Sequence, residues 1–352
     1  MQGRRQIQKK LIALQNITII GGSGLLGRNL IKNLHEWNVT NLDKKPLKKS
    51  YQNENYQEIL GDASDEKILR KALMNADVVW IKAAKLANER HLDSAKDEYI
   101  KINTELPKKI LKQCKELNIK KIFFDSSDAI FLDNWKKNKH LPFSKHSPKD
   151  YYGKSKSKAE QAIKKWAHED KDRSVQIFRY TRVASNGNLR LLSLWCIQNQ
   201  LNIPLKIFGD GERSGCMIHI DDCVEANLKA LNLKPNFDIY NLTLAPIRLS
   251  ELAKKVIKIK NKNGQFAYVE DTFSHPTDPM IHAMDPGETW KKLSYKPKKT
   301  VNDIVKESHT FVEGELNKKI PKILKSMSSL NIVKKIIRIL IIKNLEKQGI
   351  QI

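Results

Sequence analysis

A β-branched segment that ends in three regularly spaced glycines constrains this 352-residue chain more than any other feature. Residues 16–20 are followed by Gly21, Gly24 and Gly27, and then by an amphipathic segment, residues 28–34. A strand, a glycine turn and a helix in this order form a cradle in which backbone N–H groups at the helix start bind a pyrophosphate. The segment therefore predicts a dinucleotide-binding site, because the strand and the helix that the motif requires are both present.

Strands and helices are expected to alternate through the first half of the chain. Apolar runs at 37–43, 56–62, 77–84 and 121–125 predict strands, and segments such as 65–73 between them have the apolar spacing of helices. Short alternating elements imply parallel βαβ units, so the expected fold class is α/β, a Rossmann-type doubly wound parallel sheet. Ligands of such sheets lie at the carboxyl ends of the strands.

An acidic residue, Asp43, ends the second predicted strand. It lies about 20 residues beyond the glycines, where a carboxylate can accept the hydroxyls of an adenosine ribose. A carboxylate there favours NAD over NADP, since it would repel a 2′-phosphate, although Lys44 and Lys45 could offset the repulsion. The alternative role for Asp43 is that of a turn residue at the strand end.

Three residues with acid–base potential follow the fifth predicted strand. Ser127 comes directly after it, and Tyr152 and Lys156 lie four residues apart on a predicted helix, so they share one face. A lysine ammonium near a tyrosine favours the phenolate, and we expect it to lower the pKa of Tyr152 towards neutrality. The tyrosine could then exchange a proton with a substrate hydroxyl or carbonyl.

Together these motifs resemble the extended short-chain dehydrogenase/reductases, and more narrowly the NAD-dependent epimerase/dehydratase family that acts on nucleotide sugars. The resemblance rests on the glycine spacing and on five further segments: Gly61-Asp62, Ser126-Ser127, Tyr152-Gly-Lys-Ser-Lys156, Phe208-Gly-Asp-Gly-Glu212 and His219-Ile-Asp-Asp222. It implies an NAD(P)-binding Rossmann domain, mainly residues 1–180, interleaved with a smaller substrate-binding domain, mainly residues 181–314. A basic tail, residues 315–352, lies outside the resemblance.

The resemblance also implies roles for individual residues. NAD contacts are expected from Gly21, Gly24, Leu25, Leu26, Gly27, Asp43, Asp62, Ala83, Ala84, Asn103, Tyr152 and Lys156. The expected catalytic residues are Ser127, Tyr152 and Lys156, with Asp128 beside them. Substrate contacts are expected from Ser127, Arg182 and Arg213.

Several positions depart from the family pattern. Asp128 stands where sugar 4,6-dehydratases have an acidic general acid, but Ala129 replaces the glutamate that usually follows. The same segment resembles that of the dTDP-4-keto-rhamnose reductases, without its aromatic residue. Arg182 replaces a usual asparagine, and Gly215 stands where a diphosphate-binding arginine is usual. Either Arg182 supplies the lost charge, since an arginine fork suits phosphate, or the substrate carries no diphosphate.

The leading hypothesis is an enzyme that uses NAD to oxidise and rearrange a sugar hydroxyl, with a nucleotide sugar or another phosphorylated sugar as substrate. In the epimerase version, Tyr152 removes the proton of the 4-hydroxyl while hydride passes to NAD, and hydride returns to the opposite face. An NAD(P)H-dependent keto-sugar reductase is the alternative within enzymes. A non-catalytic nucleotide-binding scaffold is the alternative of another class, and the presence of Tyr152 and Lys156 argues against it.

The formal net charge of +25 comes mostly from lysines spread over the whole chain. This distribution favours solvated lysine faces over a nucleic-acid site, for which no aromatic-interleaved basic platform is present. The four cysteines form no CxxC pair, so reduced thiols, a cytoplasmic location and no metal site are expected. At His219, the neighbouring Asp221 and Asp222 are expected to cap a helix rather than to bind a metal.

The tail contains a basic amphipathic segment. Ile332, Val333, Ile336, Ile337 and Leu340 share one helical face, with lysines and an arginine largely elsewhere. It could contact an anionic membrane peripherally or pack on its own domain or on a partner subunit. A homodimer is expected.

Overall fold

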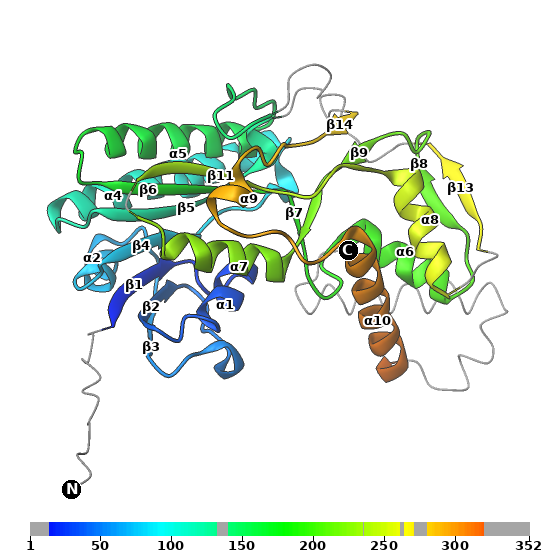
Figure 1. The fold of residues 1–352 in the computed structure, drawn as a ribbon, viewed down its shortest axis with the longest axis horizontal. Coiled ribbons are helices and arrows are strands. Elements are labelled where there is room, and N and C mark those ends of the chain that lie inside the picture. The colour runs from blue at the N-terminus through cyan, green and yellow to red at the C-terminus, as the bar shows by residue number, and fades with distance from the viewer. Residues whose placement is uncertain (1–13, 132–139, 235, 261–263, 271–279, 320–352) are drawn as a thin grey trace, which may run out of the picture.

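The computed structural model describes residues 14–131, 140–234, 236–260, 264–270 and 280–319. In these residues a large parallel sheet is covered by helices on both faces, and a second group of helices and short strands lies at one end of it (Figure 1). The predicted tail segment around residues 332–340 lies outside the described residues.

The central sheet has seven parallel strands in the order β11-β6-β5-β4-β1-β2-β3. Their bounds are β1 (Gln15–Ile20), β2 (Trp37–Asp43), β3 (Tyr56–Leu60), β4 (Val78–Ile81), β5 (Lys121–Ser127), β6 (Ser174–Tyr180) and β11 (Phe237–Leu242). The doubly wound parallel sheet expected from the sequence is therefore confirmed. The direction of winding reverses between β1 and β4, and ligands of such sheets bind outside this switch point.

Two layers of helices bury the sheet. One face is covered by α2 (Glu66–Leu73), α4 (Leu106–Glu116) and α5 (Tyr151–His168), and the other by α1 (Leu25–Ile31) and α7 (Ile220–Leu231). Because both faces are covered, every residue of β4 and β6 is buried. This explains why these strands are continuous apolar runs in the sequence rather than alternating ones.

The remaining elements form a second hydrophobic core, whose buried residues all fall between Ala184 and Leu316. Its helices are α6 (Arg190–Gln200), α8 (Leu249–Lys260) and α10 (Val301–Lys319). Its short strands are β8 (Leu205–Phe208) and β13 (Phe266–Val269), which pair with each other. Since α10 runs on to Lys319 and buries Leu316 in this core, the tail does not begin at residue 315 as expected.

Short strands lie between the two cores. They are β7 (Arg182–Ala184), β9 (Ser214–Gly215), β10 (Met217–His219), β12 (Ile247–Arg248) and β14 (Ile281–His282). β7 pairs with β10, and β9 pairs with both β12 and β14. Two further short helices are α3 (Lys96–Tyr99) and α9 (Thr289–Lys292).

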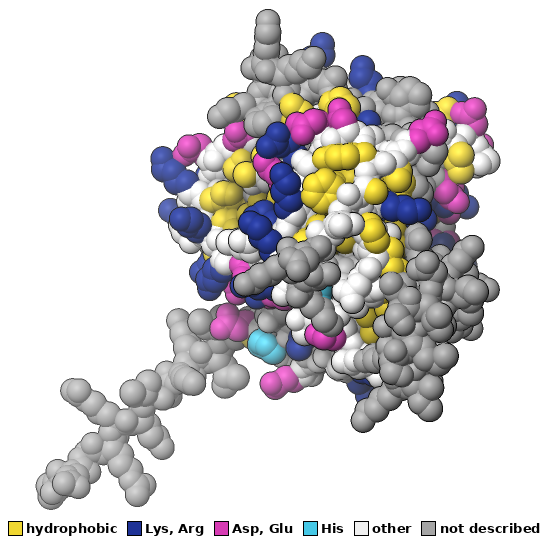
Figure 2. All heavy atoms as spheres, turned by 90° about the vertical axis from the view of Figure 1, so that its right-hand side faces the viewer, with side chains coloured by type: hydrophobic (Ala, Val, Ile, Leu, Met, Phe, Trp, Pro, Cys, Tyr) yellow, Lys and Arg dark blue, Asp and Glu magenta, His cyan; other side chains and the backbone are white. Residues whose placement is uncertain are grey.

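The surface carries mixed charge. On the face shown in Figure 2, lysine and arginine side chains are interspersed with acidic and apolar ones. This arrangement agrees with lysines on solvated faces. No helix in the described part of the chain is long and apolar enough to cross a membrane.

Candidate active site

The glycine turn between β1 and α1 takes the shape that a phosphate cradle requires. Gly21 has φ +88°, and a Cβ on it would lie 2.5 Å from the backbone nitrogen of Ala83, at the end of β4. A Cβ on Gly27 would lie 2.5 Å from the carbonyl oxygen of Gly22. These glycines let the turn, the helix and the neighbouring strand end approach one another closely.

Gly24 differs, because nothing in the protein crowds it. A Cβ there would meet only the Gly21 oxygen, at 3.5 Å, and the residue is exposed immediately before the first helical residue, Leu25. The first N–H groups of a helix have no helical acceptor. The turn therefore offers N–H donors beside open space, and it fits the pyrophosphate of a dinucleotide.

Side chains from β2 hold the turn in place. Gly22 N–H donates to Asn41 Oδ1 at 3.0 Å, and Ser23 N–H donates to Asp43 Oδ2 at 3.0 Å. Asp43 ends β2 as expected and faces the turn, where further lone pairs can accept ribose hydroxyls. Asn41 was not singled out from the sequence, since an asparagine inside a strand carries no motif.

Asp62 is the residue expected near the adenine. Its carboxylate forms an ion pair with Lys44 at 2.9 Å and accepts from the Ser64 N–H. These contacts, that of Lys44 above all, lower the pKa of Asp62 to about 2. Because Lys44 pairs with Asp62, only Lys45 remains to offset the repulsion between the Asp43 carboxylate and the 2′-phosphate of NADP.

Asn103 lies in a π-helical turn, Ile100–Glu105, between α3 and α4. Its amide oxygen accepts from Lys85 N–H at 2.8 Å, and its amide nitrogen donates to the Lys85 carbonyl and to Ser155 Oγ. These bonds order the loop after β4, whose first residues are Lys82, Ala83 and Ala84. Both amide N–H groups of Asn103 are used in these bonds, which gives it a positioning role for this loop, and its contact with a cofactor stays a prediction.

Tyr152 lies in the first turn of α5, beside the end of β5. Asp150 caps the helix by accepting from Gly153 N–H at 2.6 Å. A Cβ on Gly153 would lie 2.2 Å from the Ala129 carbonyl oxygen, so this glycine lets the helix approach the loop after β5. As a result, Tyr152 and Ser127 are neighbours at this strand end, and both are buried.

The ionisation of this pair differs from the expectation. Burial raises the pKa of Tyr152; the neighbouring Ser127 hydroxyl opposes the shift, and the charge of Asp128 adds to it. Lys156 donates from Nζ to the Asp125 carbonyl at 2.8 Å, and its own burial lowers its pKa to about 8. The expected lowering of the Tyr152 pKa is therefore wrong in this structure, because desolvation prevails over the neighbouring ammonium.

A buried ion pair that the sequence did not reveal lies behind this strand end. Lys82 donates to both carboxylate oxygens of Asp125, at 2.9 and 3.2 Å, and both side chains are buried. Trp80 Nε1 donates to the same carboxylate at 2.7 Å. Because the Asp125 carbonyl accepts from Lys156, this network fixes the strand end from which Lys156 is held.

Asp128 lies in a single 3-10 turn, Asp128–Ile130, directly after β5. Its Oδ1 accepts from the Ser127 hydroxyl at 3.1 Å, and its Oδ2 lies 3.4 Å from His282 Nε2. The structure thus brings together the predicted Ser127, Asp128, Tyr152 and Lys156. His282 was missed, since a histidine 154 residues away in the sequence carries no local signal.

Arg182 and Gly215 lie against each other. A Cβ on Gly215 would stand 2.3 Å from Arg182 Nη1, so the absence of a side chain at 215 leaves the space that this guanidinium uses. Arg182 is exposed, and no ion pair joins it to another described residue. Arg213, the other predicted substrate residue, is half-buried and precedes β9.

In the described parts of the chain, His219 belongs to no group of three or more His, Cys, Asp and Glu side chains that could hold a metal ion. Its side chain caps α7 by accepting from Asp221 N–H at 3.2 Å. The expected caps, Asp221 and Asp222, do not perform this role. Asp222 instead accepts from Tyr295 Oη and from the Lys298 N–H, because the segment after α9 packs against it.

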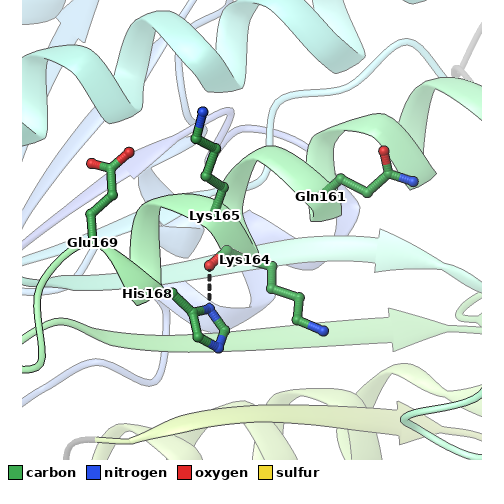
Figure 3. Close-up of a pocket in the computed structure, with 5 residues that line it drawn as sticks. All are labelled: Gln161, Lys164, Lys165, His168 and Glu169. Atoms are coloured by element: carbon green, nitrogen blue, oxygen red, sulfur yellow. Dashed lines mark hydrogen bonds between the residues drawn. The ribbon is translucent and has the colours of Figure 1, made fainter.

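A surface hollow of about 530 Å³ lies elsewhere, on the C-terminal half of α5 (Figure 3). Its lining residues are Gln161, Lys164, Lys165, His168 and Glu169. Lys164 is twelve residues from Tyr152, about 18 Å along the helix at 1.5 Å per residue. The hollow is therefore separate from the strand ends that carry the predicted catalytic residues.

Comparisons with known proteins agree with this geometry. Residues 17–243 match the model of the NAD dependent epimerase/dehydratase family. An Escherichia coli O157:H7 protein, N-acetyl-alpha-D-glucosaminyl-diphospho-ditrans,octacis-undecaprenol 4-epimerase, is 28% identical over 260 residues, which are 70% of this chain and 73% of that protein.

Two solved structures share the fold. The UDP-glucose 4-epimerase of Thermotoga maritima matches with a TM-score of 0.74 at 20% identity, over 86% of this chain and 100% of that one. The UDP-N-acetylglucosamine 4-epimerase of Methanobrevibacter ruminantium M1 matches with a TM-score of 0.72 at 22% identity, over 87% and 99%.

Proposed function

Because this chain belongs to the NAD-dependent epimerase/dehydratase family, we propose that it is an NAD-dependent 4-epimerase of a hexose that carries a diphosphate on its anomeric carbon. One observation above all supports this. The neighbouring, buried side chains of Tyr152 and Ser127 lie at the carboxyl ends of the strands, on the same edge of the sheet as the glycine turn. A proton acceptor is thereby placed where a dinucleotide and a sugar can meet.

NAD is the proposed cofactor. Gly21, Gly24 and Gly27 would hold its pyrophosphate, Asp43 its adenosine ribose and Asp62 its adenine end. The Asp43 carboxylate favours NAD over NADP, because it would face a 2′-phosphate. When bound, NAD would supply a reversible hydride acceptor for the sugar.

The acid–base steps belong to the chain itself. Ser127 and Tyr152 would hold the sugar 4-hydroxyl between them, and Tyr152 Oη would accept its proton and later give it back. Lys156, held by the Asp125 carbonyl, would lie beside the nicotinamide ribose. With its pKa lowered to about 8, Lys156 remains mostly cationic at neutral pH, and its charge would favour the phenolate of Tyr152 against the effect of burial.

Arg182 supports a diphosphate in the substrate. Its guanidinium is exposed against Gly215, between β7 and β9, and a planar fork of N–H donors suits phosphate oxygens. The related 4-epimerases act on substrates of two kinds, a UDP-sugar or a sugar joined through a diphosphate to a polyprenol. The diphosphate is common to both, so we assign the substrate by that group.

A keto-sugar reductase is the second candidate. The contact between Ser127 and Asp128 favours it, because the reductases that this segment resembles also have an aspartate after the strand-end hydroxyl. A dehydratase is less favoured, since Ala129 offers no second carboxylate.

Turnover of three probes tests the proposal: UDP-N-acetylglucosamine, UDP-glucose and N-acetylglucosaminyl-diphospho-undecaprenol. An epimerase converts at least one of them to its C4 epimer, measured by chromatography and NMR, with no net change in absorbance at 340 nm. A reductase would leave all three unchanged and consume NADH only with a 4-keto sugar. A protein that retains NAD but converts neither kind of sugar would be a scaffold.

A homodimer and peripheral membrane contact remain predictions. The sedimentation of the protein with anionic liposomes tests the membrane contact, by comparison with a shortened chain. The truncation should follow Lys319 rather than residue 315, because Leu316 is buried in the second core. Equal partitioning of the two proteins would argue against membrane contact through residues 320–352.

A further inference from the structure

Glu160 is a buried carboxylate that the proposed reaction does not use. It lies on α5 four residues after Lys156, which itself lies four residues after Tyr152, so the three side chains follow one another on one face of the helix. Only 3% of Glu160 is exposed. A carboxylate in the interior requires charged and hydrogen-bonded partners in place of the water that it has lost.

The first partner of Glu160 is the end of β5. The Ser126 hydroxyl donates to Glu160 Oε1 at 2.5 Å, in the interior of the protein. Ser126 lies between Ser127 and Asp125, and the Asp125 carbonyl accepts from Lys156 Nζ at 2.8 Å. Two successive turns of α5 are therefore joined to two successive residues of this strand end.

Arg179 holds the other side of the carboxylate. It lies on β6 directly opposite Ser126 and donates from Nε to Glu160 Oε1 at 2.9 Å and from Nη2 to Oε2 at 2.6 Å. Such a two-point contact fixes the direction of a carboxylate. Burial alone would raise the pKa of Glu160, but the charge of Arg179 and the contacts of Arg179 and His146 prevail and lower it to about 2, so the carboxylate is ionised.

The same guanidinium reaches the chain segment between Asp128 and α5. Arg179 Nη1 donates to the Pro142 carbonyl at 2.6 Å, and Nη2 lies 3.0 Å from His146 Nε2. The other ring nitrogen of His146 lies 2.8 Å from Ser157 Oγ, on α5. The ion pair thus joins the strand end, the helix and the segment that leads into the helix.

Stability alone does not account for this pair. A buried ion pair is often no more stabilising than apolar side chains of similar volume, because the cost of desolvation offsets the attraction. Apolar side chains cannot provide a fixed hydrogen-bond acceptor for Ser126. The direction of the contacts, rather than the burial, is therefore what the ion pair adds to the site.

We propose that Glu160 is a positioning residue of this active site and is itself held by Arg179. Its carboxylate fixes Ser126 and with it the backbone at the end of β5. Ser127, and the carbonyl that holds Lys156, thereby keep their distances from the face of α5 that carries Tyr152. This role rests on the proposed function, because it concerns the alignment of the acid–base residues.

The substitution Ser126→Ala tests this role in the full-length protein, because it removes only the hydroxyl that Glu160 holds. We expect kcat to fall about tenfold, less than the roughly 100-fold that a misplacement of 1 Å can cost. The KM and the affinity for NAD should change little. Ser174→Ala is the matched control, since this buried hydroxyl donates to the Asn236 carbonyl at the opposite end of β6. An unchanged kcat in Ser126→Ala, or an equal loss in Ser174→Ala, would overturn the proposal.

A variant without the ion pair separates positioning from stability. Glu160→Met combined with Arg179→Met leaves no buried charge unpaired, and urea unfolding should show a stably folded protein. Its kcat should nevertheless fall at least as far as in Ser126→Ala. Adding Ser126→Ala to this variant should then lower kcat little further, because the hydroxyl has already lost its acceptor. A folded variant with full kcat, or a further loss as large as that of Ser126→Ala alone, would overturn the proposal.

Amide hydrogen exchange without any sugar distinguishes failure of this inference from failure of the proposed function. Ser126→Ala should speed exchange in residues 124–130, at the end of β5, and leave exchange in β2 unchanged, since only the local contact is lost. Unchanged exchange at the end of β5 would overturn the inference even if the protein is an active epimerase. If none of the sugar probes is turned over, faster exchange confined to this strand end would still support the positioning contact.

Discussion

The Asp128 carboxylate accepts a hydrogen bond from the Ser127 hydroxyl at 3.1 Å, between residues adjacent in the chain. A negative charge thus lies beside the serine that also contacts Tyr152. Burial raises the pKa of Tyr152, and this charge raises it further. Since the phenolate is the form that accepts a proton from a sugar hydroxyl, activity should increase with pH through that pKa.

The substitution Asp128→Asn should therefore move the pH profile. It keeps an acceptor for Ser127 but removes the charge, so the pKa of Tyr152 falls. The rising limb of kcat/KM should shift to lower pH by about one unit. Asp128→Glu keeps the charge and should leave the limb closer to that of the unchanged protein. An unmoved limb in the Asn variant would show that Asp128 does not influence Tyr152.

The dinucleotide preference should depend on Asp43. In Asp43→Ala the ribose loses its acceptor and a 2′-phosphate loses its repulsion, so the affinity for NAD should fall relative to that for NADP. Titration calorimetry with both nucleotides measures the ratio. Asp65→Ala provides a control, because Asp65 caps α2 and has no place at the glycine turn. An equal ratio in the unchanged protein and Asp43→Ala would exclude Asp43 from the ribose site.

The buried ion pair of Lys82 and Asp125 should matter for stability. Asp125→Asn leaves the Lys82 ammonium buried without its counter-charge, and breaking such pairs costs about 3–5 kcal/mol of unfolding free energy. Urea unfolding followed by circular dichroism measures this cost. Arg248→Gln removes one partner of the exposed pair with Glu251 and should change the unfolding free energy far less, because water screens this pair. Similar costs for the two variants would contradict the account of this network.

Because Arg182 lies against Gly215, we expect substitutions at either residue to weaken substrate binding. Arg182→Gln should weaken binding of UDP-N-acetylglucosamine by about 1.5–3 kcal/mol, the range for a hydrogen bond to a charged group. Gly215→Ala should also weaken it, since the added methyl would displace the guanidinium. Calorimetry on both variants, with Arg248→Gln as control, provides the measurement. Unchanged affinity in Arg182→Gln would place the diphosphate elsewhere.

Local patterns explain what the sequence could predict. The strand, glycine turn and helix from residue 15 to residue 31 are specified by neighbours in the chain, and so are the position of Asp43 at a strand end and the spacing of Tyr152 and Lys156. These features follow from side-chain size and helical period, which a single sequence displays.

Contacts between residues far apart in the chain explain which features of the site the sequence did not predict. Asn41 holds the glycine turn, Lys82 pairs with Asp125, and His282 faces Asp128. The two partners of each contact lie on different strands or loops. The direction of the Tyr152 pKa was missed for a related reason. The i, i+4 spacing shows the ammonium, but only the folded protein shows how deeply the phenol is buried and where Lys156 points.

The most direct test of the proposed chemistry follows a deuterium on the sugar. A substrate labelled with deuterium at C4 is incubated with the enzyme, and the epimer is analysed by NMR and mass spectrometry. If hydride passes from C4 to NAD and returns within the same site, the product should keep the deuterium at C4, with no net NADH at 340 nm, and Tyr152→Phe should form almost no product while still binding NAD. Loss of the deuterium to solvent, or its accumulation in free NADH, would contradict a mechanism in which the hydride returns to the sugar from which it came.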